Sequence, residues 1–213
     1  MRIGFMGGTF SPPHIGHFNA AKDFYRDEKL DRLIIIPARV SPFKADSKAT
    51  ATDSQRFDMA RLCFKKLSAQ YGYNVDISKL ELENDDVSYT YITIRKLKEL
   101  YTPQELIMYV GSDMFLSLEK WKNASEIFSS CTIYTHRRQK SEADILLETK
   151  KRYEKLFGAK IHISPGKEVV ISSTDIRREI QSKKSSNCQN LLTDEVLRYI
   201  IDNGLYLQEN YEQ

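Results

Sequence analysis

The chain has 213 residues, of which 29% are charged and 41% hydrophobic, with a formal net charge of +3 at pH 7. This length suits one α/β domain with a sizeable core, and the composition is that of an ordinary globular protein. The weak net charge gives no argument for a nucleic-acid-binding protein, and no apolar stretch approaches the roughly 20 residues that span a bilayer.

The first quarter of the chain alternates short apolar runs with helical patterns. Residues 2–7 predict a buried strand, and the glycine-rich turn that ends it distinguishes this segment from a signal peptide. Residues 14–27 carry apolar or small side chains at helical spacing. The continuous apolar run 31–38 is typical of a parallel strand covered on both faces. Residues 39–54 form a polar connection longer than a β–α loop needs, and 52–70 follow as a capped helix.

The rest of the chain continues this alternation. It predicts strands at 75–82, 105–111, 131–136 and 159–164, and helices at 90–101, 172–182 and 193–206. We interpret the polar stretch 183–192 as a loop between the last two helices. Strands that alternate with helices indicate βαβ units, so the predicted fold class is α/β, a doubly wound parallel sheet with a small C-terminal helical part.

Three cysteines, Cys63, Cys131 and Cys188, are widely spaced and form no C-x-x-C pair. Neither a zinc site nor a disulfide framework is therefore predicted. We expect small buried hydrophobic residues with reduced thiols, which fits a cytoplasmic protein.

Five unusual segments follow predicted strands. They are GGTFSPPH, PARVSPFK, GSDMF, HRR and SSTD, and each begins just past the carboxyl end of an apolar run. In an open parallel sheet that edge holds the ligand crevice. The five segments together therefore predict one binding site at the carboxyl edge of the sheet.

The first of these segments has the chemistry of a phosphate site. Gly7 and Gly8 allow a sharp turn and a close approach of backbone N–H groups to a ligand. His14 opens a helix, whose N-terminus attracts phosphate, and His17 shares one helix face with it. Imidazoles at this position can donate hydrogen bonds to phosphate oxygens and stabilise the charge that develops on them.

Other interpretations of this segment remain open. The two histidines could be half of a metal site, although no third ligand has a clear spacing, or they could only cap the helix. Neither the Walker A pattern nor G-x-G-x-x-G is present. A different kind of phosphate site is the interpretation that remains.

The motifs also carry a resemblance. HIGH at 14–17, within GGTFSPPHIGH, together with ISSTDIR at 171–177, resembles the small adenylyltransferases of the nucleotidyltransferase superfamily. SYTYITI (88–94), GSDMFLSLEKWKN (111–123) and RVSPFK (39–44) are similar to segments of bacterial nicotinate-mononucleotide adenylyltransferases. The resemblance covers nearly the whole chain.

This resemblance implies a fold and a reaction. The fold would be a Rossmann-like α/β sheet, with residues 1–213 as a single nucleotidyltransferase domain whose C-terminal helices, about 172–206, carry the second ATP motif. The reaction would join ATP and nicotinate mononucleotide into deamido-NAD and pyrophosphate, with Mg²⁺ carried by the ATP phosphates and no metal held by the protein. The attacking phosphate is already an anion, so this chemistry requires positioning and charge neutralisation rather than a general base.

The resemblance also assigns site residues. The expected catalytic residues are His14, His17 and Arg177. ATP would be bound by these three and by Gly7, Gly8, Thr9, Phe10, Gly111, Asp113, Ile171, Ser173 and Thr174. Nicotinate mononucleotide would be bound by Lys44, Thr90, Trp121 and Arg137. Alternatively, Trp121 is a partly buried core residue, and Lys44 and Arg137 are solvated surface charges.

Alternative functions remain at this point. One is an adenylyltransferase for nicotinamide mononucleotide or pantetheine phosphate, which SYTYITI and LEKWKN disfavour. Another is a nucleotide-binding module without activity, against which the intact His14, His17 and Arg177 argue. A nucleic-acid binder is disfavoured by the weak charge. We expect small-molecule substrates, no nucleic-acid or membrane partner, and leave open a homo-oligomer.

Overall fold

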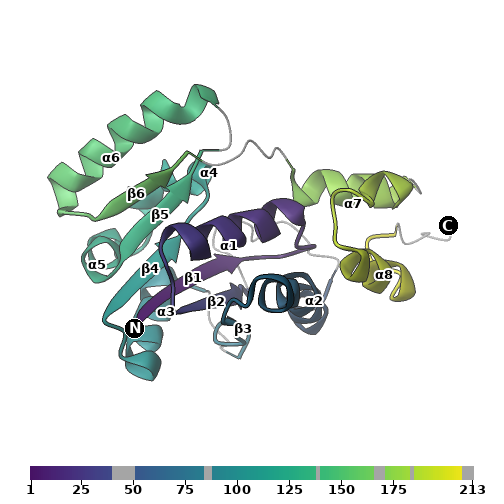
Figure 1. The fold of residues 1–213 in the computed structure, drawn as a ribbon. Coiled ribbons are helices and arrows are strands. Elements are labelled where there is room, and N and C mark those ends of the chain that lie inside the picture. Colours follow the sequence, from purple (N-terminus) through teal and green to yellow (C-terminus); the bar gives the residue numbers. More distant parts are fainter. Residues whose placement is uncertain (40–50, 84–87, 138–139, 166–170, 183–184, 208–213) are drawn as a thin grey trace.

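The structure is a computed structural model that describes residues 1–39, 51–83, 88–137, 140–165, 171–182 and 185–207. Within these residues, six parallel strands form one sheet in the order β3-β2-β1-β4-β5-β6 (Figure 1). The strands are β1 (Arg2–Gly8), β2 (Arg32–Pro37), β3 (Val75–Ile77), β4 (Glu105–Tyr109), β5 (Thr132–His136) and β6 (Ile161–Ser164). The prediction of a doubly wound parallel sheet is confirmed.

Eight α-helices are described. They are α1 (Ile15–Asp27), α2 (Asp53–Tyr71), α3 (Thr90–Tyr101), α4 (Ser112–Phe115), α5 (Ala124–Ser130), α6 (Ala143–Phe157), α7 (Ser173–Gln181) and α8 (Asp194–Asp202). Helices α7 and α8 lie beyond the carboxyl ends of the strands (Figure 1). None of the described helices is long and apolar enough to cross a membrane.

The sheet is covered on both faces, because alternate residues of its strands enter two separate cores. On β1, Met6 packs with α1, α2, α7 and α8, whereas Ile3 and Phe5 pack with α3, α5 and α6. Leu33 and Ile34 divide between the two cores in the same way. A strand buried on both faces has no polar side, which explains the continuous apolar runs in the sequence.

The strand order reverses beside β1. Strand β1 pairs with β2 from Ile3 through Gly8, but its pairing with β4 ends at Met6. Gly7 and Gly8 therefore run past the end of β4 with no strand on that side. In open α/β sheets the ligand crevice lies at such a reversal, beyond the carboxyl ends of the strands.

Several boundaries differ from the predictions. The strand expected at 75–82 ends at Ile77, because this edge strand pairs with β2 over three residues and the chain then turns, with the Glu83 N–H bonded to the Lys79 carbonyl. The helix expected at 193–206 ends at Asp202, and Gly204 then turns the chain with φ +59°.

The structure contains helices that the sequence does not predict. These are α4, α5 and α6, although α6 buries Leu146, Thr149 and Tyr153 at helical spacing. The expected loop at 183–192 contains a short 3₁₀ helix, Ser185–Cys188, and buries Cys188 and Leu192 in the core. This segment also accepts a hydrogen bond from the start of α1, Ile15 N–H to the Leu191 carbonyl (2.9 Å).

Candidate active site

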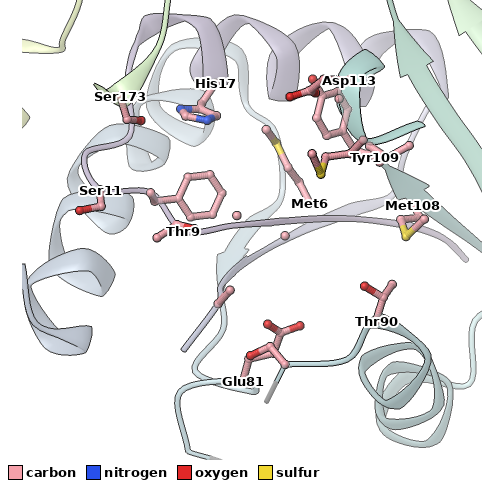
Figure 2. A pocket seen from close by; sticks show the side chains of 18 of the residues that line it. Met6, Thr9, Ser11, His17, Glu81, Thr90, Met108, Tyr109, Asp113 and Ser173 are labelled. Atoms are coloured by element: carbon pink, nitrogen blue, oxygen red, sulfur yellow. The ribbon is translucent and has the colours of Figure 1, made fainter. Parts of the chain in front are cut away.

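A cavity of about 800 Å³ opens at the carboxyl edge of the sheet, where the strand order reverses. Residues from the end of β1, the starts of α1, α3 and α7, and the segments after β4 line it. Among them are fourteen predicted site residues: Gly7, Gly8, Thr9, Phe10, His14, His17, Thr90, Gly111, Asp113, Trp121, Ile171, Ser173, Thr174 and Arg177. Figure 2 shows His17 and Ser173 on one side of β1 and Thr90 on the other.

The turn after β1 is built around the Phe10 ring. Phe10 has a left-handed backbone (φ +50°), and its side chain is almost fully buried. The ring meets Phe64 and His17 edge-on, at centroid distances of 5.5 and 5.3 Å. A Cβ at Gly8 would lie 2.9 Å from this ring, so only glycine fits there. This packing fixes the path of the backbone along the cavity wall.

His14 and His17 cap the start of α1 reciprocally. The His14 N–H donates to His17 Nδ1 (3.2 Å), and the His17 N–H donates to His14 Nδ1 (3.4 Å). The two rings stack at a centroid distance of 3.7 Å. Because each Nδ1 accepts a hydrogen bond, the proton of each neutral ring lies on Nε2, which is therefore the donor atom of the ring. The capping alternative and the phosphate-site interpretation are therefore compatible.

The C-terminal helices are fastened to the segment between Phe10 and α1. Ser172 caps α7 by accepting the Asp175 N–H (3.1 Å). Ser173 Oγ donates to the Pro12 carbonyl (2.9 Å), and Arg177 donates to the Ser11 carbonyl (2.8 Å). The two ends of the chain, where the two predicted ATP motifs lie, thus form one wall of the cavity.

Arg177 keeps donor capacity for a ligand. Its guanidinium contacts the Ser11 carbonyl and, through Nη2, Thr174 Oγ1 (3.2 Å). A guanidinium carries five N–H donors, so these two hydrogen bonds hold the group without exhausting it. Arg177 therefore supplies a fixed positive charge on the wall that also contains His17.

The start of α3 forms the opposite part of the cavity. Tyr89 is the N-cap residue and makes no side-chain capping bond, and no acidic residue lies in the first turn. Within the described part of the chain, no acceptor receives the N–H of Thr90 or of Tyr91. Exposed N–H groups at a helix start favour a bound anion. Lys122 lies 4.3 Å from the centre of the Tyr89 ring and also lines the cavity.

Glu81 lies in the same part of the cavity and was not predicted as a site residue. Its Oε1 accepts a hydrogen bond from Thr93 Oγ1 (2.6 Å), and Figure 2 shows it on the same side of β1 as Thr90. Burial raises the pKa of Glu81, although hydrogen bonds from Thr93 and Ser88 act in the opposite direction. The alternating pattern of residues 75–82 predicts a strand there, so the sequence does not indicate that Glu81 lies at the site.

Two predicted contacts are not brought to the cavity. Lys44 lies outside the described residues. Arg137 is described but does not line the cavity, and its Nε donates to the Pro165 carbonyl (3.3 Å). Their roles stay predictions. Within the described residues, no three His, Cys, Asp or Glu side chains gather as a metal site.

Comparison with known proteins shows which family this chain belongs to. Residues 5–179 match the model of the cytidylyltransferase-like family. A relative from Carboxydothermus hydrogenoformans that carries the name nicotinate-nucleotide adenylyltransferase is 31% identical over 96% of this chain and 98% of its own. A relative of the same name from Clostridium botulinum is 32% identical over 98% of this chain and 99% of its own.

Solved structures share the fold. Nicotinic acid mononucleotide adenylyltransferase from Plasmodium falciparum, complexed with APC, has a TM-score of 0.76 and 16% identity, and the match covers 96% of each chain. The same enzyme complexed with NaAD has a TM-score of 0.75, covering 96% of this chain and 97% of that one. The Rossmann-like α/β fold is therefore confirmed.

Proposed function

The chain belongs to the cytidylyltransferase-like family and, within it, to the nicotinate-nucleotide adenylyltransferases, and from this we propose that it is an adenylyltransferase of NAD biosynthesis. It joins ATP and nicotinate mononucleotide into deamido-NAD and pyrophosphate. One observation supports this most: a single cavity brings together the two predicted ATP motifs, at His17 and Arg177, and the uncapped start of α3. Two substrates can therefore meet end to end.

The residues of the cavity suit a reaction that depends on positioning. The phosphate of the mononucleotide attacks the α-phosphorus of ATP, and pyrophosphate leaves. Negative charge grows on the departing oxygens, which the Nε2 donors of His14 and His17 and the guanidinium of Arg177 would stabilise. Because the donors are already oriented by the helix cap, they need no rearrangement when the charge appears.

Magnesium would take part in the reaction as a component of the ATP substrate. An Mg²⁺ ion is held largely by phosphate oxygens and water in sites of this type. We propose that it arrives with ATP and neutralises phosphate charge, while His17 and Arg177 act on the oxygens that the ion leaves uncovered.

The start of α3 would bind the carboxylate of nicotinate. A carboxylate has two oxygens that can accept the Thr90 and Tyr91 N–H groups, whereas a carboxamide would turn its own NH₂ donor toward them. An unpaired buried polar group costs roughly 1–3 kcal/mol, so we expect a preference for the acid of at least about 10-fold. Trp121, which lines the same part of the cavity, would stack on the pyridine ring.

The setting of the enzyme is also part of the proposal. We propose small-molecule substrates, with no nucleic-acid or membrane partner, and action in the cytoplasm, where the reduced and buried Cys63, Cys131 and Cys188 would stay reduced. The oligomeric state stays open, as it does in the sequence.

The test is pyrophosphate release from ATP with three acceptors assayed side by side: nicotinate mononucleotide, nicotinamide mononucleotide and pantetheine phosphate. We expect the highest kcat/KM with nicotinate mononucleotide. Equal values for the first two acceptors would favour a dual-specificity enzyme, and activity with pantetheine phosphate alone would remove the assignment.

A further inference from the structure

Arg56, on helix α2, is a buried cation that does not line the cavity. It is 1% exposed and makes four hydrogen bonds. Nη1 donates to the carbonyls of Thr9 (2.7 Å) and Ala38 (2.6 Å). Nη2 donates to the Arg39 carbonyl (3.3 Å) and to the Asp53 carboxylate (2.6 Å). Three of the four acceptors are thus backbone carbonyls just past the ends of β1 and β2.

The hydrogen bond to the Thr9 carbonyl fixes the orientation of the Thr9–Phe10 peptide, in the turn after β1. In a trans peptide the C=O of one residue and the N–H of the next point in opposite directions. Since Arg56 holds the Thr9 carbonyl on the α2 side, the Phe10 N–H points away from Arg56. Phe10 lines the cavity, and no acceptor receives its N–H among the residues that the structure describes. Arg56 therefore keeps a backbone donor available on the ATP side.

The second contact acts on the other half of the cavity. Arg56 holds the Ala38 carbonyl, so the Arg39 N–H points the opposite way, where it donates to Ser88 Oγ (3.3 Å). Ser88 also hydrogen-bonds to Glu81, which accepts from Thr93 in the first turn of α3. These hydrogen bonds therefore hold Ser88, which precedes Thr90 in the sequence, and Thr93, which follows it.

No other side chain could make these contacts at once. A planar guanidinium spans several carbonyls in fixed directions, whereas a lysine offers three donors on a single nitrogen. A charge this deeply buried is costly unless it is well paired, and its one carboxylate partner, Asp53, is half exposed. The position therefore demands an arginine for geometry rather than for charge alone.

We propose that Arg56 is a positioning residue that orients both substrate subsites at once, the Thr9–Phe10 peptide on the ATP side and the Ser88–Thr90 segment on the pyridine side. The inference rests on the proposed function, because it assigns these two segments to the two substrates. It predicts that one substitution outside the cavity disturbs both turnover and the preference for the acid nucleotide.

The test compares Arg56→Lys with Ser88→Ala and with Leu67→Ala, a fully buried residue near the other end of α2 that does not line the cavity. In Arg56→Lys we expect kcat to fall about 100-fold, as misplacement of reacting groups by about 1 Å can cause. The ratio of kcat/KM for nicotinate and nicotinamide mononucleotides should also fall, by about 10-fold for one lost hydrogen bond.

The other two variants separate positioning from stability. Ser88→Ala removes only the hydrogen bonds that lead from Arg39 to the pyridine side of the cavity. It should therefore lower the kcat/KM ratio of acid to amide nucleotide and leave the KM for ATP unchanged. Leu67→Ala should lower the melting temperature and leave kcat and the ratio as they are. If Arg56→Lys behaves like Leu67→Ala, the inference is wrong. If Arg56→Lys does not fold, an unchanged kcat/KM ratio in Ser88→Ala would show that Ser88 does not orient the pyridine side, which overturns that part of the inference.

Hydrogen exchange supplies a measurement that does not depend on activity. The peptides that cover residues 9–13 and 88–92 should exchange faster in Arg56→Lys than in Leu67→Ala at equal stability, and equal rates would overturn the inference. Should the wild-type protein release no pyrophosphate, the proposed function fails, while the exchange rates still decide whether Arg56 positions these segments.

Discussion

His17 has two separate tasks at the start of α1. Its Nδ1 accepts the His14 N–H, and in the proposed reaction its Nε2 donates to a phosphate oxygen. His17→Ala removes both. Loss of the cap should cost about 1 kcal/mol of folding stability, and loss of a donor to developing phosphate charge about 3 kcal/mol of barrier, or about 100-fold in kcat.

Thr193→Ala is the matched control for this prediction. Thr193 caps α8 by accepting the Val196 N–H and lies outside the cavity lining. We expect both variants to lose a similar, small amount of thermal stability, and only His17→Ala to lose turnover. Turnover close to that of wild type in His17→Ala would show that the histidine only caps the helix.

Gly8 is required by packing rather than by backbone conformation. A Cβ there would meet three atoms of the Phe10 ring at 2.9–3.3 Å, and that ring is held between Phe64 and His17. Gly8→Ala should therefore lower the melting temperature and, because it shifts Phe10 and His17, kcat. A Cβ at Gly7 meets nothing within 4 Å, so the melting temperature of Gly7→Ala should match wild type. Equal melting temperatures for both variants would contradict this account.

Helix α3 allows its N–H groups to be tested without loss of the helix. Thr90 is the first helical residue, a position where proline is well tolerated, and Tyr89 before it has the extended backbone that precedes proline (φ −91°, ψ 125°). Thr90→Pro removes the N–H together with the hydroxyl, whereas Thr90→Ala removes the hydroxyl alone. The kcat/KM ratio of acid to amide nucleotide should fall more in Thr90→Pro than in Thr90→Ala.

Trp121→Ala is the contrasting variant for this prediction. A stacked ring binds the acid and the amide nucleotide about equally, so the KM for both should rise while their ratio stays near the wild-type value. If the ratio is the same in Thr90→Pro and Thr90→Ala, the start of α3 does not select the acid.

At the level of elements, the sequence predicts the sheet better than the helices of its second half. A strand buried on both faces has a continuous apolar sequence, and such a run or an alternating pattern predicts each of the six strands. Helix α6 was missed because its buried face is interrupted by charged residues and contains Thr149. Strand β3 was predicted too long because pairing, which only the fold determines, ends after three residues.

The site was predictable wherever a motif carries it, and not where tertiary contacts create it. The glycines, His14 and His17 form one continuous motif and ISSTDIR forms another, so each can be recognised in the sequence. Arg56 and Glu81 act through carbonyls and hydroxyls that are remote in the chain. One signal for Arg56 was present: it occupies a position on the same helical face as Met59, Ala60 and Cys63, where an apolar residue is expected.

At the scale of the whole molecule, the reactivity of two cysteines tests the packing of the two cores. Cys63 lies in the core under α1 and α2, and Cys131 in the core on the other face. Burial raises the pKa of each thiol to about 12. Since only the thiolate attacks thiol reagents, both should react far more slowly in the native protein than in denaturant. Mass spectrometry after alkylation checks this, and rapid labelling of either thiol in the native protein would contradict the described packing.

In the proposed reaction, the cavity as a whole places an acceptor phosphate against the α-phosphorus of ATP. The most direct measurement follows two labels in parallel, ATP labelled at its α-phosphorus and ATP labelled at its γ-phosphorus, each incubated with nicotinate mononucleotide. We predict that the α-label enters the dinucleotide and the γ-label leaves in pyrophosphate, and that neither moves when the mononucleotide is omitted. Transfer of the γ-label to the mononucleotide, or no transfer of the α-label, would contradict the account.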